Sequence, residues 1–540
     1  MAINLASKKI LVVDDQAIMR ETFKHILGSF GARFIVEAES GISAITAMRI
    51  DRFDIVLCDY NLLRGKNGQQ VLEEAKYLKL LPVHAIFIMV TCEQSQQMVL
   101  SAIDNKPDDY LIKPFNPQQL LSRIQRCHAR KQYLAGIENE MDNGNLYQAI
   151  QCCKQLLQQN DKKMRLPLLK LHAELALKVG DFKTAEAIYQ DILEERELPW
   201  ARLGLGSTAF FLGYYDQAVK TFQALIEQHP VMMEAYDWLV KTYELMGNDE
   251  HAVSSLNSAV TLSPLSILRQ KKLALLAERT ENLPVAKKAY TATIKLGKNS
   301  IHRSSSDYSG LANIYLKSNA ANEALKILYE LNQQFRDDPE AKLRSALLEI
   351  EIHQAKGNKT MAQQAYGKAF KLNEQFDKQL SKELRLEMAK TFYLNGNNGI
   401  CDEILNDLIK TNIDDNLFIK NIVTLCDTII GENYAETLLQ QIKKELVDIN
   451  NKGVRLFQEG NIKGALAVFE QAIIKIPDNQ TIILNMIKII IHDIKTSKPD
   501  PEKIMSAQSY INKAIQVGIS HNQISGLQTE LNTIEYKTHP

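Results

Sequence analysis

The segment ILVVDD, residues 10–15, decides the fold of the first part of the chain, because a short apolar run there ends in two aspartates. Three later apolar runs also end in a residue suited to phosphoryl chemistry: Phe53–Cys58 is followed by Asp59, Ala85–Val90 by Thr91, and Asp109–Ile112 by Lys113. A fifth run, residues 34–36, ends in no such residue. Short apolar runs of this kind predict buried strands.

Amphipathic stretches lie between these runs. One carries Ile18, Phe23 and Ile26, and the next carries Ile42 and Ile45, at spacings typical of helices. The alternation predicts an α/β domain with a parallel sheet. Ligands bind such sheets beyond the carboxyl ends of the strands, so we expect the polar residues that follow the runs to converge on one place.

Three carboxylates at that place would repel one another. At about 4 Å and an effective dielectric constant near 20, two like charges repel by roughly 4 kcal/mol. Asp14, Asp15 and Asp59 therefore favour a hard divalent cation with oxygen ligands, such as Mg²⁺. Taken alone, Asp14 and Asp15 also fit a solvated acidic loop, and Lys113 also fits a surface lysine before a turn proline.

Four segments together resemble the signature segments of the receiver domain of bacterial response regulators. They are VVDD (12–15), LCDYN (57–61), VT (90–91) and LIKPF (111–115), and the resemblance covers about residues 7–130. It implies a flavodoxin-like, doubly wound domain with a five-stranded parallel sheet in the order 2-1-3-4-5.

The resemblance also implies roles for single residues. Asp59 would accept a phosphoryl group from a histidine kinase or a histidine phosphotransfer protein. Thr91 and Lys113 would hold the phosphoryl oxygens, and Tyr110 would turn inward when Thr91 moves. The Mg²⁺ ligands would be Asp14, Asp15, Asp59 and the main-chain carbonyl of Asn61. Asn61 and Glu93 would tune self-dephosphorylation, which we expect to be slow, and no other catalysis is implied.

The loop after Asp59 departs from the commonest family pattern. Leu62 and Leu63 stand where Met-Pro is frequent, and the stretch to Gly68 is one residue longer than usual, with Arg64 and Lys66 in it. These changes remove no chemical group from the expected site. They leave the conformation of the loop and the choice of kinase open.

Beyond about residue 135 a 34-residue period replaces the strand signals. Gly213 and Gly247 lie 34 residues apart, and so do Pro230 and Pro264. A small residue is followed four positions later by an aromatic residue or leucine, in the pairs Ala185/Tyr189, Ala218/Phe222, Ala252/Leu256, Ala286/Tyr290, Ala324/Leu328, Ala362/Tyr366 and Ala465/Phe469. The step from Ala286 to Ala324 is 38 residues, which indicates an insertion.

This pattern resembles the tetratricopeptide repeat, a helical hairpin that must stack on its neighbours to bury its apolar face. We expect a receiver domain over residues 1–130 and an all-α solenoid over residues 131–540. The solenoid should have about nine to eleven units, degenerate near residues 381–445 and at the C-terminus. Such solenoids present a concave face to peptides or protein surfaces.

Composition limits the other functions. Lys plus Arg and Asp plus Glu both number 64, so net charge gives no argument for binding nucleic acid or an anionic membrane. Residues 120–132 carry Arg123, Arg126 and Arg130, which fit a last receiver helix with a basic face better than a nucleic-acid arm. The apolar stretch Ile482–Ile491 is too short to span a bilayer, and no signal peptide is evident, so we expect a cytoplasmic protein.

The sequence thus predicts a non-enzymatic response regulator whose repeats bind a protein partner in a phosphorylation-dependent way. Two alternatives stay open. The receiver could be a kinase-docking module on a constitutive adaptor, or the protein could be a phosphate sink in a relay. The identity of kinase and partner, the sign of the control and a homodimer through the receiver are also open.

Overall fold

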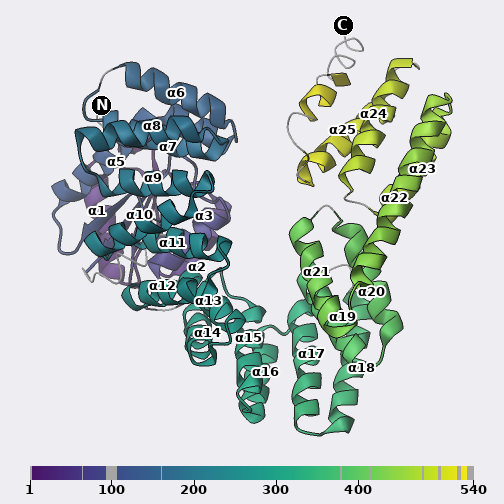
Figure 1. Ribbon diagram of the computed structural model, residues 1–540. Coiled ribbons are helices and arrows are strands. Elements are labelled where there is room, and N and C mark those ends of the chain that lie inside the picture. The colour runs from purple at the N-terminus through teal and green to yellow at the C-terminus, as the bar shows by residue number, and fades with distance from the viewer. Residues whose placement is uncertain are drawn as a thin grey trace. The chain divides into compact units, whose positions relative to one another are not determined.

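A five-stranded parallel sheet lies at the centre of the N-terminal domain in the computed structural model (Figure 1). The strands are β1 (Lys9–Val13), β2 (Phe34–Ala38), β3 (Ile55–Asp59), β4 (Ile86–Thr91) and β5 (Asp109–Ile112). Their order is β2-β1-β3-β4-β5, and each neighbouring pair is parallel. This confirms the predicted flavodoxin-like topology.

The structure describes residues 3–63, 65–92, 106–159, 161–376, 380–413, 415–476, 479–496, 500–517, 519, 524–528 and 530–531. The chain divides into two compact units, Met1–Phe335 and Arg336–Pro540. Within the described ranges no helix is long and apolar enough to cross a membrane.

Helices cover both faces of the sheet. The first four that the structure describes are α1 (Ala17–Ser29), α2 (Gly41–Ile50), α3 (Gly68–Tyr77) and α5 (Pro117–Asp142). One apolar cluster joins Phe23 of α1 and Ile124 of α5 to the sheet, and a second joins Met48 of α2 and Leu72 of α3 to its other face. Each fully buried side chain of this kind contributes about 1.5–3 kcal/mol. The domain is therefore doubly wound, as the sequence predicts.

Helix α5 connects the sheet domain to the repeats without a break. Its Leu120 and Ile124 belong to the core of the sheet domain, whereas Ile137 belongs to the core of the first repeat. Arg123 and Arg126 on this helix form ion pairs with Asp109, at 2.9 and 2.6 Å, which supports its interpretation as the last receiver helix. The expected division at residue 130 falls inside α5 and stays a prediction.

Antiparallel helical hairpins follow in the first unit (Figure 1). Their helices are α6 (Leu146–Gln158), α7 (Arg165–Val179), α8 (Phe182–Glu195), α9 (Pro199–Phe211), α10 (Tyr215–Gln228), α11 (Met233–Leu245), α12 (Asp249–Leu262), α13 (Ile267–Arg279), α14 (Leu283–Gly297), α15 (Ser305–Lys317) and α16 (Ala321–Gln334). The alternation of two helices per period confirms the predicted helical repeats.

The second unit continues the helical pattern. It contains α17 (Pro339–Ala355), α18 (Lys359–Phe376), α19 (Lys382–Leu394), α20 (Asn398–Thr411), α21 (Asn416–Ile429), α22 (Tyr434–Gln458), α23 (Ile462–Lys475), α24 (Gln480–Thr496) and α25 (Pro501–Gln516). Cys401 is fully buried in α20, at the position where the other repeats carry alanine. The region near residues 381–445 is helical despite its weak sequence signature.

The small-residue positions explain how the hairpins stack. Tyr189 of α8 lies against Gly204 of α9, where an added Cβ would lie 2.2 Å from the Cζ atom of the tyrosine. Tyr290 of α14 lies in the same way against Gly310 of α15, with 2.3 Å to Cζ. The aromatic ring therefore occupies the space that a side chain on the next hairpin would need.

Candidate functional site

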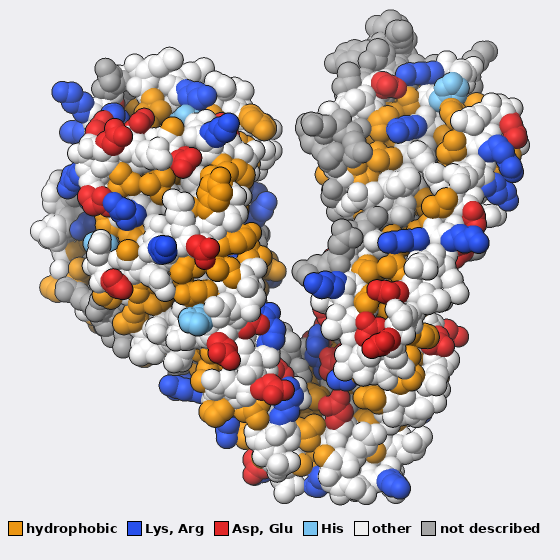
Figure 2. Space-filling model, in the orientation of Figure 1, with side chains coloured by type: hydrophobic (Ala, Val, Ile, Leu, Met, Phe, Trp, Pro, Cys, Tyr) orange, Lys and Arg blue, Asp and Glu red, His pale blue; other side chains and the backbone are white. Residues whose placement is uncertain are grey.

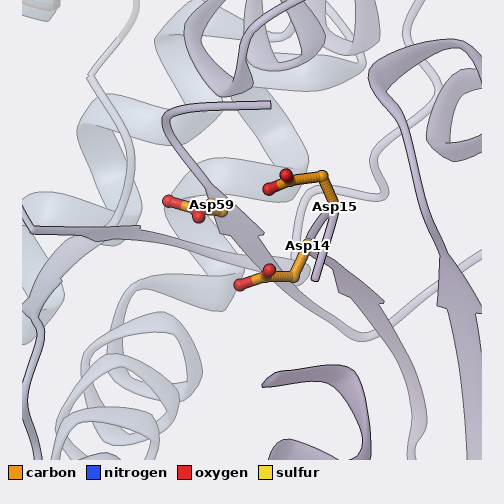
Figure 3. A group of neighbouring side chains, drawn as sticks. All are labelled: Asp14, Asp15 and Asp59. Atoms are coloured by element: carbon orange, nitrogen blue, oxygen red, sulfur yellow. The ribbon is translucent and has the colours of Figure 1, made fainter. Parts of the chain in front are cut away.

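Three carboxylates meet at the carboxyl end of the sheet (Figure 3). Asp14 and Asp15 follow β1, and Asp59 ends β3, which is the neighbour of β1 in the sheet. One oxygen of each carboxylate lies within 4.8 Å of the other two. Asp14 and Asp59 are buried and Asp15 is half-buried. The convergence predicted from the strand ends is therefore present.

Lys113 links two of these carboxylates. Its Nζ atom lies 2.8 Å from Oδ2 of Asp14 and 2.9 Å from Oδ2 of Asp59. Burial alone would lower the pKa of Lys113, but the hydrogen bonds and charges of the two aspartates outweigh it and raise that pKa. Burial and the neighbouring Asp14 raise the pKa of Asp59, against the opposing effect of Lys113. The peptide bond Lys113–Pro114 is cis.

Thr91 and Tyr110 lie on the two strands beyond Asp59. Thr91 ends β4 and is buried, and β4 pairs with both β3 and β5. Tyr110 lies on β5, half-buried against the core of the domain, and burial raises the pKa of its hydroxyl to about 12. The tyrosine is therefore neutral at physiological pH. Both residues stand where the sequence places them.

Asn61 lies in the exposed loop after β3. Its backbone N–H donates to Oδ1 of Asp59 over 3.4 Å. Glu93 and Arg64 lie outside the described residues.

Two residues that sequence reasoning did not assign help to build the site. Arg20 of α1 donates from Nη1 to the carbonyl oxygens of Asp14 and Asp15, at 2.8 and 3.3 Å, and so holds the acidic loop. Gly68 at the start of α3 packs against Asp59, because an added Cβ would lie 2.3 Å from the Asp59 carbonyl oxygen. An arginine on the first turns of the helix after the acidic pair was the available signal for Arg20.

The donor set fits a hard divalent cation. Carboxylate oxygens are the ligands that Mg²⁺ prefers, and their mutual repulsion falls when a cation binds. In the structure described here, Lys113 supplies the positive charge that two of these oxygens contact. The arrangement can thus hold a cation beside a carboxylate nucleophile and an ammonium group.

The fold and the site define a doubly wound α/β domain with a buried aspartate at the carboxyl edge of its parallel sheet. A family model described as the response regulator receiver domain matches residues 10–125. The chemotaxis protein CheY of Pseudomonas aeruginosa is 32% identical over 125 residues, which make 23% of this chain and 97% of that protein. The chain belongs to the response regulator receiver family.

Solved structures are also similar. A CheY-like response regulator receiver domain protein from Methanospirillum hungatei is 28% identical, and the match covers 23% of this chain and 96% of that chain with a TM-score of 0.22. A tetratricopeptide repeat protein from Parabacteroides merdae is 18% identical, with coverage of 48% and 98% and a TM-score of 0.29. Receiver domains are signalling modules of two-component systems that accept a phosphoryl group on an aspartate and interact with histidine kinases or phosphotransfer proteins.

Proposed function

We propose that this protein is a response regulator that accepts a phosphoryl group on Asp59 and uses its repeats to bind a protein partner in a phosphorylation-dependent way. The observation that carries the proposal is the geometry around Asp59, where Asp14, Lys113 and Thr91 converge at adjacent strand ends. A carboxylate is a competent phosphoryl acceptor when nearby positive charge neutralises the transferring group.

The transfer itself is a displacement at phosphorus. A carboxylate oxygen of Asp59 attacks a phosphohistidine, the new O–P bond forms, and the P–N bond breaks. Its electron pair remains on the imidazole, which then takes up a proton. Lys113 holds one phosphoryl oxygen, the Thr91 hydroxyl donates to another, and the new group adds about −1.5 to −2 charges. A bound Mg²⁺, held by Asp14, Asp15, Asp59 and the carbonyl of Asn61, would neutralise charge on the phosphoryl oxygens.

The other residues at the site and the partners of the protein also have proposed roles. Asn61 and Glu93 tune the slow loss of the phosphoryl group to water, and Tyr110 follows the movement of Thr91.

The phosphoryl donor is a histidine kinase or a histidine phosphotransfer protein, and the protein acts in the cytoplasm. Nucleic acid and membrane take no part, and a homodimer through the receiver is compatible with the proposal.

A pocket in the first unit supports partner binding by the repeats. It has a volume of about 470 Å³ and lies among α7, α9 and α11, where Trp200, Phe211 and Trp238 line it. Aromatic side chains of this kind are frequent anchors of protein interfaces. Figure 2 shows further hydrophobic side chains that reach the surface over α10–α12.

One of the residues that line this pocket, Lys106, comes from the receiver. Lys106 precedes β5 and pairs with Glu234 of α11 over 2.9 Å, and both residues line the pocket. A change in the receiver near β5 would therefore reach the pocket directly. This ion pair supports a link between phosphorylation and binding.

The test is a comparative pull-down from lysate of the source cells. Wild-type protein with Mg²⁺ and beryllofluoride is compared with Asp59→Asn, and the captured proteins are identified by mass spectrometry. A partner enriched in one state only would support a phosphorylation-controlled scaffold and would give the sign of the control. Identical partners in both states would favour the constitutive adaptor, and no partner in either state would favour the phosphate sink.

A further inference from the structure

The loop that follows the phosphoacceptor strand contacts the repeats. The carbonyl oxygen of Gly65 accepts a hydrogen bond from Nδ2 of Asn299 over 2.8 Å. Lys66 Nζ donates to the carbonyl oxygen of Asn299 over 2.7 Å, and Gln70 Nε2 donates to that of Leu296 over 3.3 Å. We call these three hydrogen bonds the loop–repeat contact. It joins the β3–α3 loop and the start of α3 to the end of α14 and the connection that follows it.

The contact is anchored in the core of the receiver. Lys66 Nζ also lies 2.9 Å from the buried carboxylate of Glu74 on α3, which Arg49 of α2 approaches to 3.4 Å. The ring of Tyr77 at the end of α3 meets the ring of His302 edge-on, at 6.3 Å between centroids. The receiver side of the contact is therefore held by charged groups of α2 and α3, and the two rings add a further contact between receiver and repeat.

Both partners in the contact are longer than their patterns require. The β3–α3 loop carries one residue more than the commonest receiver sequence. The connection between α14 and α15 spans residues 298–304, whereas the corresponding connections after α10 and α12 span only 229–232 and 263–266. The two longer segments contact each other. Neither the receiver nor the helical repeat needs this contact for its own fold.

The loop is tied to Asp59 at its other end. The Asn61 N–H donates to Oδ1 of Asp59, and the Gly68 N–H donates to the carbonyl oxygen of Tyr60 over 2.9 Å. Gly68 itself lies against the carbonyl of Asp59. Because the loop is held at both ends, a displacement of the backbone at Asn61 must change the backbone conformation of the few residues that follow, close to Gly65 and Lys66.

We propose that the α14–α15 connection is an intramolecular docking partner of the phosphoacceptor loop, which it holds in the unphosphorylated protein and releases when Asp59 is phosphorylated. The inference rests on the proposed role of Asp59. The contact is formed in the state in which Lys113 pairs with Asp14 and Asp59. A phosphoryl group on Asp59 would compete with Asp14 and Asp59 for Lys113, and the carbonyl of Asn61 would be one of the groups that hold a bound Mg²⁺. If this weakens the contact, loss of the contact must strengthen phosphoryl binding by the same factor.

Hydrogen exchange measured by mass spectrometry on the full chain tests the release. The probe is beryllofluoride with Mg²⁺, and three segments are followed: residues 14–20, 60–68 and 296–304. We expect slower exchange at 14–20, which reports binding, together with faster exchange at 296–304. Slower exchange at 14–20 with no change at 296–304 would overturn this inference and leave the proposed function standing. No change at 14–20 would overturn both.

A pair of substitutions tests the reciprocal effect. Gln70→Glu keeps the Oε1 acceptor that caps α3 and removes the donor to Leu296, and Asn299→Ala removes the donor to Gly65. The double variant should exchange faster at 296–304 without ligand. It should bind beryllofluoride at least about threefold more tightly in a ¹⁹F NMR titration, because one net hydrogen bond gives about three- to tenfold and two are removed.

The matched control is Gln228→Glu with Asn257→Ala, two exposed positions on α10 and α12. It should leave both the exchange and the affinity at the wild-type values. A double contact variant with unchanged exchange at 296–304, or with faster exchange and unchanged affinity, would overturn the inference.

Discussion

At the scale of single residues, the site depends on how Lys113 compensates the carboxylates around it. Asp14 is fully buried and Asp59 nearly so, and Lys113 contacts both. A buried charge that loses its partner costs several times more than a surface ion pair contributes. The same ammonium therefore stabilises the domain without ligand and, in the function proposed above, holds a phosphoryl oxygen.

Replacing this ammonium separates the two effects. In Lys113→Met, the free energy of opening β1 and β3 should fall by about 3 kcal/mol without divalent cations. Mg²⁺ should stabilise Lys113→Met more than it stabilises the wild type, because it binds the same carboxylates. Hydrogen exchange of β1 and β3, with and without Mg²⁺, measures both. Lys24→Met, which removes an exposed partner of Glu37, is the control, and an equal loss in both variants would contradict the prediction.

A buried histidine in the repeats makes stability depend on pH. His172 of α7 is 7% exposed, and burial, aided by Lys154, lowers the pKa of its imidazole. Below the ordinary histidine pKa the unfolded chain therefore binds more protons than the folded chain, so stability falls as the pH decreases from about 7 toward the lowered pKa. His172→Gln should remove this part of the pH dependence.

Urea unfolding at pH 7 and pH 5.5 measures that difference. Both tryptophans of the chain, Trp200 and Trp238, lie in the first unit, so tryptophan fluorescence follows the unit that contains His172. A pH dependence that is identical in wild type and His172→Gln would show that other groups cause it.

At the scale of elements, the repeats depend on glycine where an aromatic ring crosses to the next helix. Tyr189 fills the space above Gly204, and Tyr290 fills the space above Gly310. Glycine in a helix costs about 1 kcal/mol relative to alanine, so these positions give up helix propensity for close packing. Gly136 of α5, in contrast, has nothing within 4 Å of an added Cβ.

These two environments predict opposite effects of one substitution. Gly204→Ala should destabilise the first unit by about 1–3 kcal/mol, because the ring of Tyr189 and the helix must move apart. Gly136→Ala should stabilise its helix by up to about 1 kcal/mol. Urea unfolding followed by tryptophan fluorescence compares them, and a stabilising effect at Gly204 would contradict the packing argument.

At the scale of the whole molecule, the sheet domain and the hairpins up to α16 form one compact unit, and the helices from α17 onward form another. The first unit holds the proposed phosphoacceptor site, the aromatic pocket and the loop–repeat contact. The regulatory step proposed above is therefore complete within residues 1–335.

A shortened chain tests that independence. Protein that ends at Phe335 should fold and bind beryllofluoride with Mg²⁺. Its free energy of unfolding in urea, measured by tryptophan fluorescence, should lie within about 0.5 kcal/mol of that of the first unit in the full chain, since distant sites are usually additive to this extent. A larger loss of stability, or loss of beryllofluoride binding, would show that the second unit supports the first.

How far the sequence predicts the molecule differs between its parts. The ends of β1, β3, β4 and β5 were predicted to within a residue or so, because buried parallel strands leave long apolar runs that stop at a polar residue. The repeat period likewise predicts the hairpins from α7 onward. The role of Arg20 was missed because its bonds go to backbone carbonyls, and its place on the helix after the acidic pair is the one sign of that role in the sequence.

The sequence alone determined the α/β domain, the convergence of Asp14, Asp15, Asp59 and Lys113, and the helical repeats, because these follow from local periodicity and from the rule that parallel strands end at one edge. Only the tertiary structure decided that the repeats return to the receiver, since Gly65 and Asn299 lie more than 200 residues apart in the chain. Their contact consists of a few polar bonds between the β3–α3 loop with the start of α3 and the end of α14 with the connection after it. Such bonds have no periodicity, so only the folded chain reveals them.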